Sequence, residues 1–213
     1  MKKAKVKLVI EFFLLFILIP VSLPLDYPVG IKAGILLLGF VYVIYVLLRV
    51  VGISFKVKKE IAWTSFWKRI LRQFIGIALL TSIYVYMVDA NKLFCVPLNK
   101  PLLWVFILFI YSFLSVWPQE ILYRTFFFTR YESLFSNKKL FIFINAIVFS
   151  LAHLFFKNTL VLVLTFLGGL LFAYTFVKTK STSLVTIEHA VYGNWLFTVG
   201  MGDMLAFPGQ ETC

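Results

Sequence analysis

The sequence is poor in charged residues and in the side chains that bind metals or form cross-links. Only 14% of its 213 residues are charged, whereas about a quarter are charged in a soluble domain. With 62% hydrophobic residues and 25 phenylalanines, the chain cannot present a water-soluble surface. It has two histidines and two cysteines. Cys95 and Cys213 provide neither a zinc-binding spacing nor a disulfide framework.

The excess of basic over acidic residues gives a formal net charge of +12. Nucleic-acid binding would require the basic residues to gather on one surface, but here they lie between apolar segments. This distribution is typical of membrane topology signals and of contact with anionic lipid headgroups. We therefore expect the lipid bilayer, and not nucleic acid, to be the partner.

Seven apolar segments follow one another along the chain, at residues 8–24, 33–54, 70–88, 102–130, 140–156, 159–177 and 183–200. A helix needs about 20 apolar residues to cross a bilayer. The sequence therefore predicts an all-α fold, a polytopic transmembrane helix bundle of about seven spans forming a single domain over residues 1–213. The fourth segment is long and contains Pro118, which predicts a kink there.

The distribution of lysine and arginine predicts the orientation of this bundle. With the N-terminus inside, the inside segments hold 16 of the 21 Lys and Arg residues, the outside segments hold four, and Arg124 lies within a span. The first segment resembles a signal peptide, but Glu11 interrupts it and no cleavage site follows, so we expect a retained span. We expect a multi-pass protein of the cell membrane with a cytoplasmic N-terminus, most simply in the cytoplasmic membrane of a bacterium.

Two ionisable residues, Glu120 and Arg124, lie inside the fourth apolar segment. A charged side chain at the centre of a bilayer costs about 2.5–3.5 kcal/mol on insertion scales, so such residues are usually paired and functional. Because they are four residues apart, a helix places them on the same face, where they can neutralise each other. Two interpretations stay open: a buried salt bridge that only holds the span in place, or a carboxylate that orders a water molecule, with Arg124 fixing its geometry.

The two histidines lie in later apolar segments. Asn145, Phe149 and His153 are spaced four apart and form one stripe on the fifth segment, so His153 is either a hydrogen-bonded core residue or a proton-transfer group. His189 and Asn194, in the seventh segment, can both donate hydrogen bonds to a developing oxyanion or can simply link helices. Glu188 points about 100° away from His189 and is expected either to serve another neighbour or to extend to the inner membrane interface.

A metal is the weaker alternative for these groups. Two histidines and a glutamate can hold zinc in a catalytic site. However, the sequence has no His-Glu-x-x-His helix, and the candidates come from three separate segments. We therefore expect a site without a cofactor.

Three short motifs in this order resemble the CPBP family, the CAAX proteases and bacteriocin-processing enzymes, also called the Abi family. The family pattern is Glu-Glu-x-x-x-Arg, then Phe-x-x-x-His, then His-x-x-x-Asn or Asp. The chain has Gln119-Glu120-Ile121-Leu122-Tyr123-Arg124, then Phe149 to His153, then His189 to Asn194. The resemblance covers roughly residues 115–200. It departs from the pattern at Gln119, which replaces the first glutamate, and at Asn194, which comes one place late because Gly193 occupies the register position. A local bulge in the helix at Gly193 would turn Asn194 to the face that the motif requires.

The resemblance implies an intramembrane endopeptidase that needs no metal. In the family, the first glutamate of the pair and the histidine of Phe-x-x-x-His activate a water molecule. Carried over, His153 is the water partner and His189 is the oxyanion donor. Our first hypothesis is that Glu120, which matches the second glutamate, serves as the base in a shifted geometry with Arg124 orienting it, and that Asn194 stabilises the oxyanion with His189. The substrates would be membrane-anchored peptides or proteins, or C-terminal sorting segments. Because an amide cannot take a proton at physiological pH, Gln119 favours a second hypothesis, a catalytically silent binding or immunity protein of the same fold. A small transporter is the third hypothesis, but the sequence lacks the matched broken-helix repeats of such proteins.

Overall fold

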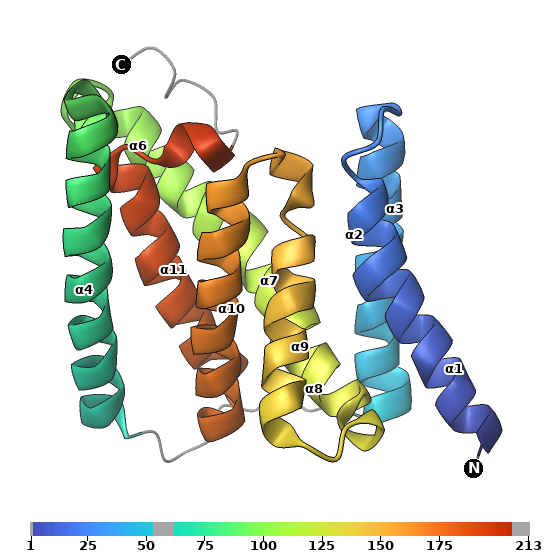
Figure 1. The fold of residues 1–213 in the computed structure, drawn as a ribbon. Coiled ribbons are helices and arrows are strands. Elements are labelled where there is room, and N and C mark those ends of the chain that lie inside the picture. The colour runs from blue at the N-terminus through green and yellow to red at the C-terminus, as the bar shows by residue number, and fades with distance from the viewer. Residues whose placement is uncertain (1, 53–61, 206–213) are drawn as a thin grey trace. The chain divides into compact units, whose positions relative to one another are not determined.

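The computed structural model describes residues 2–52 and 62–205, and within these residues it is helical, with no strand (Figure 1). Four stretches of π-helix interrupt otherwise α-helical segments. The helices before residue 100 are α1 (Lys2–Phe13), η1 (Leu14–Leu18), α2 (Ile19–Ser22), α3 (Val29–Tyr45), η2 (Val46–Val51), α4 (Trp63–Asp89), η3 (Ala90–Lys92) and α5 (Cys95–Asn99). Those after it are α6 (Pro101–Ile110), η4 (Tyr111–Val116), α7 (Trp117–Glu120), η5 (Ile121–Phe126), α8 (Phe127–Arg130), η6 (Glu132–Leu134), α9 (Lys138–Leu151), η7 (Leu154–Phe156), α10 (Thr159–Thr179), α11 (Thr182–Val199) and η8 (Gly202–Leu205).

Five helical segments among the described residues are long and apolar enough to cross a membrane. They are Val29–Val51, Trp63–Lys92, Pro101–Arg130, Lys138–Phe156 and Thr159–Thr179. The other two predicted spans are helical as well, at residues 2–22 and 182–199. The predicted all-α membrane fold is therefore confirmed, whereas the number of seven spans and the cytoplasmic N-terminus stay predictions.

The chain forms two compact units that alternate along the sequence. Unit 1 comprises residues 1–56 and 118–182, and unit 2 comprises residues 57–117 and 183–213. Unit 1 therefore holds Glu120, Arg124 and His153, and unit 2 holds His189 and Asn194.

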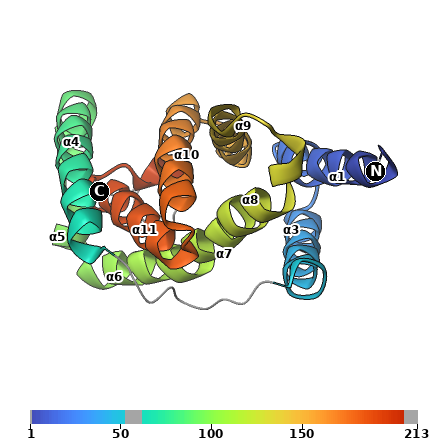
Figure 2. The ribbon, with the colours of Figure 1, turned by 90° about the horizontal axis from the view of Figure 1, so that it is seen from below.

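In unit 1, α9 and α10 pack side by side, as both views show (Figure 1, Figure 2). Each helix begins at an asparagine whose side chain accepts backbone N–H bonds, Asn137 for α9 and Asn158 for α10. Where the helices are closest, a Cβ on Gly169 would lie 3.0 Å from Cα of Ala146. Small residues permit such a close approach between membrane helices, which interact mainly through van der Waals packing.

Glu11, which interrupts the first apolar segment, has three partners in unit 1. Arg130 donates two hydrogen bonds to its carboxylate, at 2.9 and 2.8 Å, and the hydroxyls of Tyr42 and Tyr131 donate at 2.7 and 3.0 Å. Burial, and then the negative charge of Glu11, raise the pKa of Tyr131, so its phenol keeps its proton and donates. The network joins α1, α3 and α8, which explains why an apolar helix carries an acid.

In unit 2, hydrogen bonds between side chains fasten α11 to its neighbours. The Trp195 indole donates to Thr81 Oγ1 of α4 at 2.8 Å, and the Trp104 indole of α6 donates to Thr198 Oγ1 at 3.0 Å. Interhelical hydrogen bonds of this kind average about 0.6 kcal/mol in membranes, so they orient the helices more than they stabilise them.

In unit 2, Cys95 is disulfide-bonded. The only other cysteine in the chain, Cys213, lies outside the described residues. A single disulfide is not the framework of cross-links that the sequence was expected to lack.

Candidate active site

Glu120 ends a short α-helical stretch that two π-helical stretches enclose. The helix from Pro101 to Arg130 passes through η4, α7 and η5 without a break. Pro118 has no backbone N–H and its ring crowds the carbonyl four residues earlier. In η4 the N–H of Trp117 instead bonds to the carbonyl of Ser112, five residues back. Next to Pro118, where the sequence predicts a kink, the helix has the wider turns of a π-helix. Such π-helical turns are often found at functional sites.

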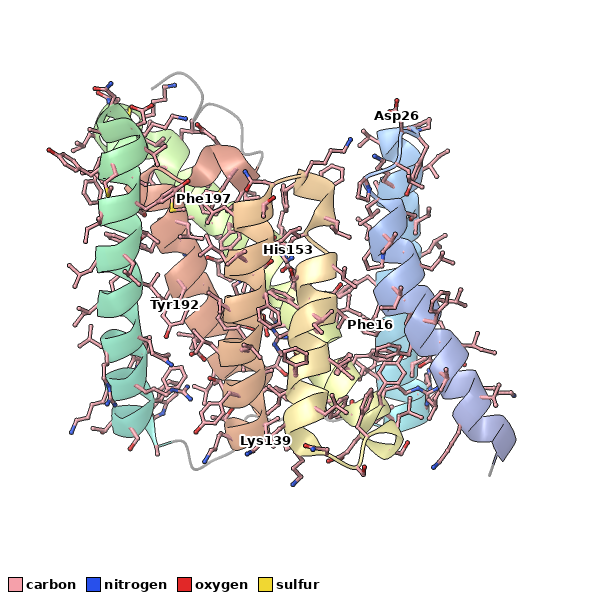
Figure 3. The ribbon with its side chains drawn as sticks, in the orientation of Figure 1. Phe16, Asp26, Lys139, His153, Tyr192 and Phe197 are labelled. Atoms are coloured by element: carbon pink, nitrogen blue, oxygen red, sulfur yellow. The ribbon has the colours of Figure 1, made fainter. Side chains whose placement is uncertain are left out.

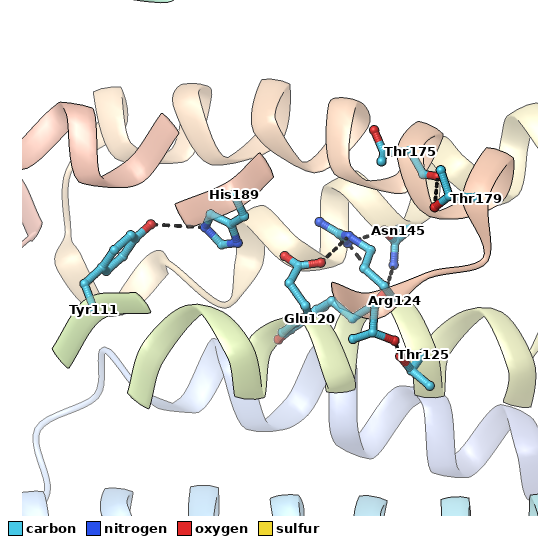
Figure 4. A network of polar contacts seen from close by, with 10 residues as sticks. Tyr111, Glu120, Arg124, Thr125, Asn145, Thr175, Thr179 and His189 are labelled. Atoms are coloured by element: carbon cyan, nitrogen blue, oxygen red, sulfur yellow. Dashed lines mark hydrogen bonds and ion pairs between the residues drawn. The ribbon is translucent and has the colours of Figure 1, made fainter. Parts of the chain in front are cut away.

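Glu120 and Arg124 form an ion pair in unit 1, at 3.2 Å between Arg124 Nε and Glu120 Oε2, and both side chains are fully buried (Figure 4). Arg124 also donates to Asn145 Oδ1 and lies over the Phe149 ring, with 4.7 Å between the guanidinium carbon and the ring centroid. Two residues of the predicted stripe on α9 therefore contact the Arg124 guanidinium. Asn145 accepts a hydrogen bond from it, and Phe149 makes a cation–π contact with it.

Asn145 is itself held in place. Its Nδ2 donates to the backbone carbonyl of Tyr123 at 2.7 Å, which links α9 to η5. Its Oδ1 accepts the hydrogen bond from Arg124. Since Nδ2 must be the donor to a carbonyl, the orientation of the amide is determined. Arg124 thus has a fixed acceptor on one side and the Glu120 carboxylate on another, which restricts where Glu120 can point.

His153 lies in the turn just after α9, between Leu151 and the 3-10 helix η7 (Figure 3). Its backbone N–H bonds to Ser150, and its Nδ1 lies 2.8 Å from the carbonyl oxygen of Phe149. Because a carbonyl only accepts, Nδ1 carries a proton in this contact. In the neutral imidazole Nε2 is then the nitrogen with the lone pair, as a proton acceptor requires.

His189 lies on α11 in unit 2 and is almost fully buried, with 6% of its surface exposed. Its Nε2 lies 3.1 Å from the hydroxyl of Tyr111 in η4 (Figure 4). A Cβ added to Gly193, four residues after His189, would lie only 2.0 Å from that hydroxyl. Gly193 therefore leaves the space that the Tyr111 phenol occupies.

Asn194 does not share this contact. Its Nδ2 donates to Ser112 Oγ at 3.0 Å, and its Oδ1 is buried with no hydrogen-bond partner among the described residues. The bulge expected at Gly193 is not found, because α11 is an uninterrupted α-helix over Thr182–Val199. The expectation was wrong because the glycine accommodates a side chain from η4 and does not bend α11.

Glu188 has partners of its own in unit 2, as its direction on the helix predicted. It is fully buried and pairs with Arg69 of α4, with 3.6 Å between Arg69 Nη2 and Glu188 Oε2. The Tyr192 hydroxyl lies 3.4 Å from Glu188 Oε1 and 3.0 Å from Gln73 Oε1. Glu188 thus connects α11 to α4.

Two comparisons find no relative. No curated protein and no solved structure matches the chain. A third finds that residues 101–195 match the family model described as "Type II CAAX prenyl endopeptidase Rce1-like". The resemblance to the CAAX proteases of the CPBP family is confirmed. The matched residues include Glu120, Arg124, His153, His189 and Asn194, so the match spans the predicted site. Together with the apolar helices, the match supports a multi-pass membrane protein.

The structure connects the predicted residues in two groups and adds members to each. In unit 1 it brings Glu120, Arg124, Asn145 and Phe149 together, and the Phe149 ring lies 4.9 Å from the His153 ring. In unit 2 it adds Tyr111 and Ser112, which the sequence analysis did not single out. Among the residues described, no group of three or more His, Cys, Asp or Glu side chains could hold a metal ion. The only sequence signal for Tyr111 was a tyrosine and a serine side by side after a run of ten mainly apolar residues, Pro101–Ile110.

Proposed function

We propose that the protein is an intramembrane endopeptidase that hydrolyses peptide bonds of membrane-associated peptides or proteins with a water molecule activated by Glu120 and His153. The observation that carries the proposal is the fully buried Glu120–Arg124 pair within the segment that matches an endopeptidase family. Buried ionisable groups in membrane helices commonly mark functional sites.

In the proposed mechanism two groups activate the water molecule, the carboxylate of Glu120 and the imidazole of His153. Glu120 takes a proton from the water while Nε2 of His153 accepts a hydrogen bond from it. The water oxygen then bonds to the peptide carbonyl carbon, and the carbon–nitrogen bond breaks as Glu120 passes the proton to the leaving amine. Arg124 orients the Glu120 carboxylate and is itself held by Asn145.

The negative charge that develops on the carbonyl oxygen requires hydrogen-bond donors. We assign this role to the imidazole of His189 and the carboxamide of Asn194. The amide of Asn194 has two hydrogens, of which Ser112 receives one. Donors fixed in a site without bulk water need little reorganisation during the reaction, which makes them effective.

The substrate class follows from the matched family and from the bilayer. The matched family is that of a CAAX prenyl endopeptidase, so a prenylated peptide ending in Cys-aliphatic-aliphatic-X is the first probe to use. A lipid-anchored substrate is already concentrated in the membrane in which the buried pair lies. Cell-membrane localisation, in the cytoplasmic membrane of a bacterium, belongs to the same proposal.

The test is cleavage of a fluorogenic farnesylated CAAX peptide by the full chain reconstituted in phospholipid vesicles. Glu120→Ala and His153→Ala should each lower kcat by about 10²–10⁴-fold, the usual contribution of a general acid–base group. Glu132→Ala is the matched control, because Glu132 is an exposed acid outside the matched motifs. Unchanged cleavage in both test variants would overturn the assignment.

A second function is favoured by Gln119, which stands where the family pattern has its first glutamate. Because a carboxamide cannot accept the proton of the water, the chain is then a catalytically silent relative that binds a membrane peptide, as a bacteriocin-immunity protein does. The variant Gln119→Glu separates the two proposals. Cleavage that appears only in this variant would identify the natural protein as silent.

We propose that the reaction uses no metal cofactor, with zinc as the competing possibility. The same vesicle assay decides between them when it is repeated with 1,10-phenanthroline and with its non-chelating 1,7 isomer as the control. Equal rates support the metal-free mechanism. A rate that falls only with the chelator, and returns on addition of Zn²⁺, would contradict it.

A further inference from the structure

We propose that Tyr111 is a positioning residue for His189: its phenol donates to Nε2, so that His189 keeps its proton on Nδ1 and acts from that nitrogen. This inference rests on the proposed function, in which His189 is an oxyanion donor. It adds a residue from η4 that none of the three sequence motifs contains. It also gives Gly193 a role, since a side chain at that position would displace the phenol.

The geometry of the contact supports the proposal. Tyr111 Oη and His189 Nε2 are 3.1 Å apart, within the range of a hydrogen bond, and the two rings meet edge to face with 6.0 Å between centroids. On its other side the Tyr111 ring packs against Phe197, with 4.8 Å between centroids. The phenol is therefore held by two residues of α11 that lie eight apart.

Gly193 determines how close the phenol can come. A Cβ there would lie 2.0 Å from Oη and 2.4 Å from two ring carbons of Tyr111, distances that real Cβ atoms essentially never show. Gly193 lies four residues after His189, so both are on the same face of α11. A residue with a side chain at 193 would take the space beside the imidazole that Tyr111 now occupies.

The chemistry follows from the choice between the two neutral forms of imidazole. A neutral histidine donates from one ring nitrogen and accepts at the other, and the partner of one nitrogen selects the role of the other. Tyrosine keeps its proton well above neutral pH, so a phenol at Nε2 favours the form with the proton on Nδ1. Nδ1 is then the nitrogen that donates to the oxyanion, and Tyr111 acts only through His189.

The chain is well suited to a direct test, because it has only two histidines. We would label the full chain with ¹⁵N-histidine, reconstitute it in lipid nanodiscs and read the protonation of each ring nitrogen from its ¹⁵N shift. The variant His153→Gln assigns the signals. In the wild type, His189 should show a protonated Nδ1 and an unprotonated Nε2. A proton on Nε2 would overturn the proposal.

Tyr111→Phe removes one oxygen atom and keeps the ring. It should transfer the His189 proton from Nδ1 towards Nε2 while the His153 signals stay unchanged. Tyr86→Phe is the control, because Tyr86 lies in the same unit and 67% of its surface is exposed. Identical His189 signals in the wild type and Tyr111→Phe would exclude a role for the phenol.

Gly193→Ala provides a second route to the same result. It should displace the phenol and change the His189 signals as Tyr111→Phe does, while Gly76→Ala, in α4 with no atom within 4 Å of the added Cβ, should not. If Gly193→Ala does not fold, Tyr111→Phe alone decides the question. Unchanged His189 signals in a folded Gly193→Ala protein would contradict the proposal.

In the peptide-cleavage assay, Tyr111→Phe should lower kcat by about 10–100-fold, as is usual for a residue that orients another, with little change in KM. If KM rises by about the same factor, 10–100-fold, while kcat stays unchanged, the positioning role is contradicted. If neither the wild type nor any variant cleaves peptide while the Nδ1 proton still depends on Tyr111, the proposed endopeptidase function fails and the control of His189 by Tyr111 stands.

Discussion

Glu120 in unit 1 and Glu188 in unit 2 are both fully buried acids, but their guanidinium partners differ in origin and in exposure. Arg124 lies four residues after Glu120 on the same helix, 3.2 Å away, and is itself fully buried. Arg69 comes from a different helix, 119 positions away, lies 3.6 Å from Glu188 and exposes 24% of its side chain. The first pair is local and sealed, whereas the second joins two helices and keeps access to its surroundings.

The two pairs should therefore respond differently to mutation. The free-energy cost of removing one partner depends on which polar groups stay beside the buried charge that is left. Removing one member of a buried ion pair is strongly destabilising, by about 3–5 kcal/mol, because the other charge stays buried without that partner. In the second pair the Tyr192 hydroxyl, 3.4 Å from Glu188, remains beside the acid. The second pair joins α4 and α11, whereas the first is the pair to which the proposed function assigns a role in the reaction.

The largest effect is expected from breaking the sealed pair. Arg124→Met should lower the free energy of unfolding by about 3–5 kcal/mol, because it leaves the buried Glu120 without its counter-charge. The double variant Glu120→Leu/Arg124→Met should recover most of this stability, because no charge is then buried. Both should be inactive towards the farnesylated peptide. Reversible unfolding in mixed micelles measures the stabilities.

The contrary result would be equally informative. If Arg124→Met is nearly as stable as the wild type, Glu120 has another counter-charge and Arg124 does not orient it. If the double variant is as unstable as the single variant, packing around Arg124 against Phe149 and Phe172, and not charge, dominates the loss.

A smaller loss is expected at the second pair. Arg69→Met should cost about 1–3 kcal/mol, the range for leaving a buried polar group without one of its partners. Lys68→Met is a suitable control, since it removes a neighbouring exposed cation from the same turn of α4. Unfolding in mixed micelles again provides the measurement. A loss at Arg69 as large as that at Arg124 would remove the distinction between the two pairs.

Each unit also has a helical glycine against which another element packs closely. Gly169 of α10 lies against Ala146 of α9, where an added Cβ would come within 3.0 Å of a backbone atom. Gly169→Ala should therefore be about 1–3 kcal/mol less stable than Gly39→Ala, because Gly39 of α3 has no atom within 4 Å of the added Cβ. Comparing the two variants cancels the intrinsic helix preference of alanine. Equal unfolding free energies would mean that α9 moves aside without cost.

The sequence could predict what lies within one helix. The Glu120–Arg124 pair follows from a spacing of four residues, and the position of Asn145 and Phe149 on one face of α9 follows from the same periodicity. The predicted stripe was wrong for His153, which lies in the turn after α9. The all-helical membrane class follows from composition. These features need no knowledge of which helices are neighbours.

What could not be predicted depends on contacts between helices. The Tyr111–His189 bond joins residues 78 positions apart, and the Glu11–Arg130 pair joins residues 119 apart. The role of Gly193 is the clearest example. From the sequence it is a residue that flexes a helix, and only the position of Tyr111 shows that it provides space for a phenol.

The smallest effect concerns Asn194, whose carboxamide donates to Ser112 Oγ at 3.0 Å. Removing this bond with Ser112→Ala should cost only about 0.6 kcal/mol of stability, the average for a side-chain hydrogen bond between membrane helices. Asn194→Ala should be about equally mild in unfolding but should lower kcat by about 10²-fold if its second N–H serves the oxyanion. Ser112→Ala keeps that second N–H and should retain most of the activity. Should both variants lose activity equally, the Asn194–Ser112 bond itself is what the reaction needs, and Asn194 orients α11 against η4 without touching the substrate.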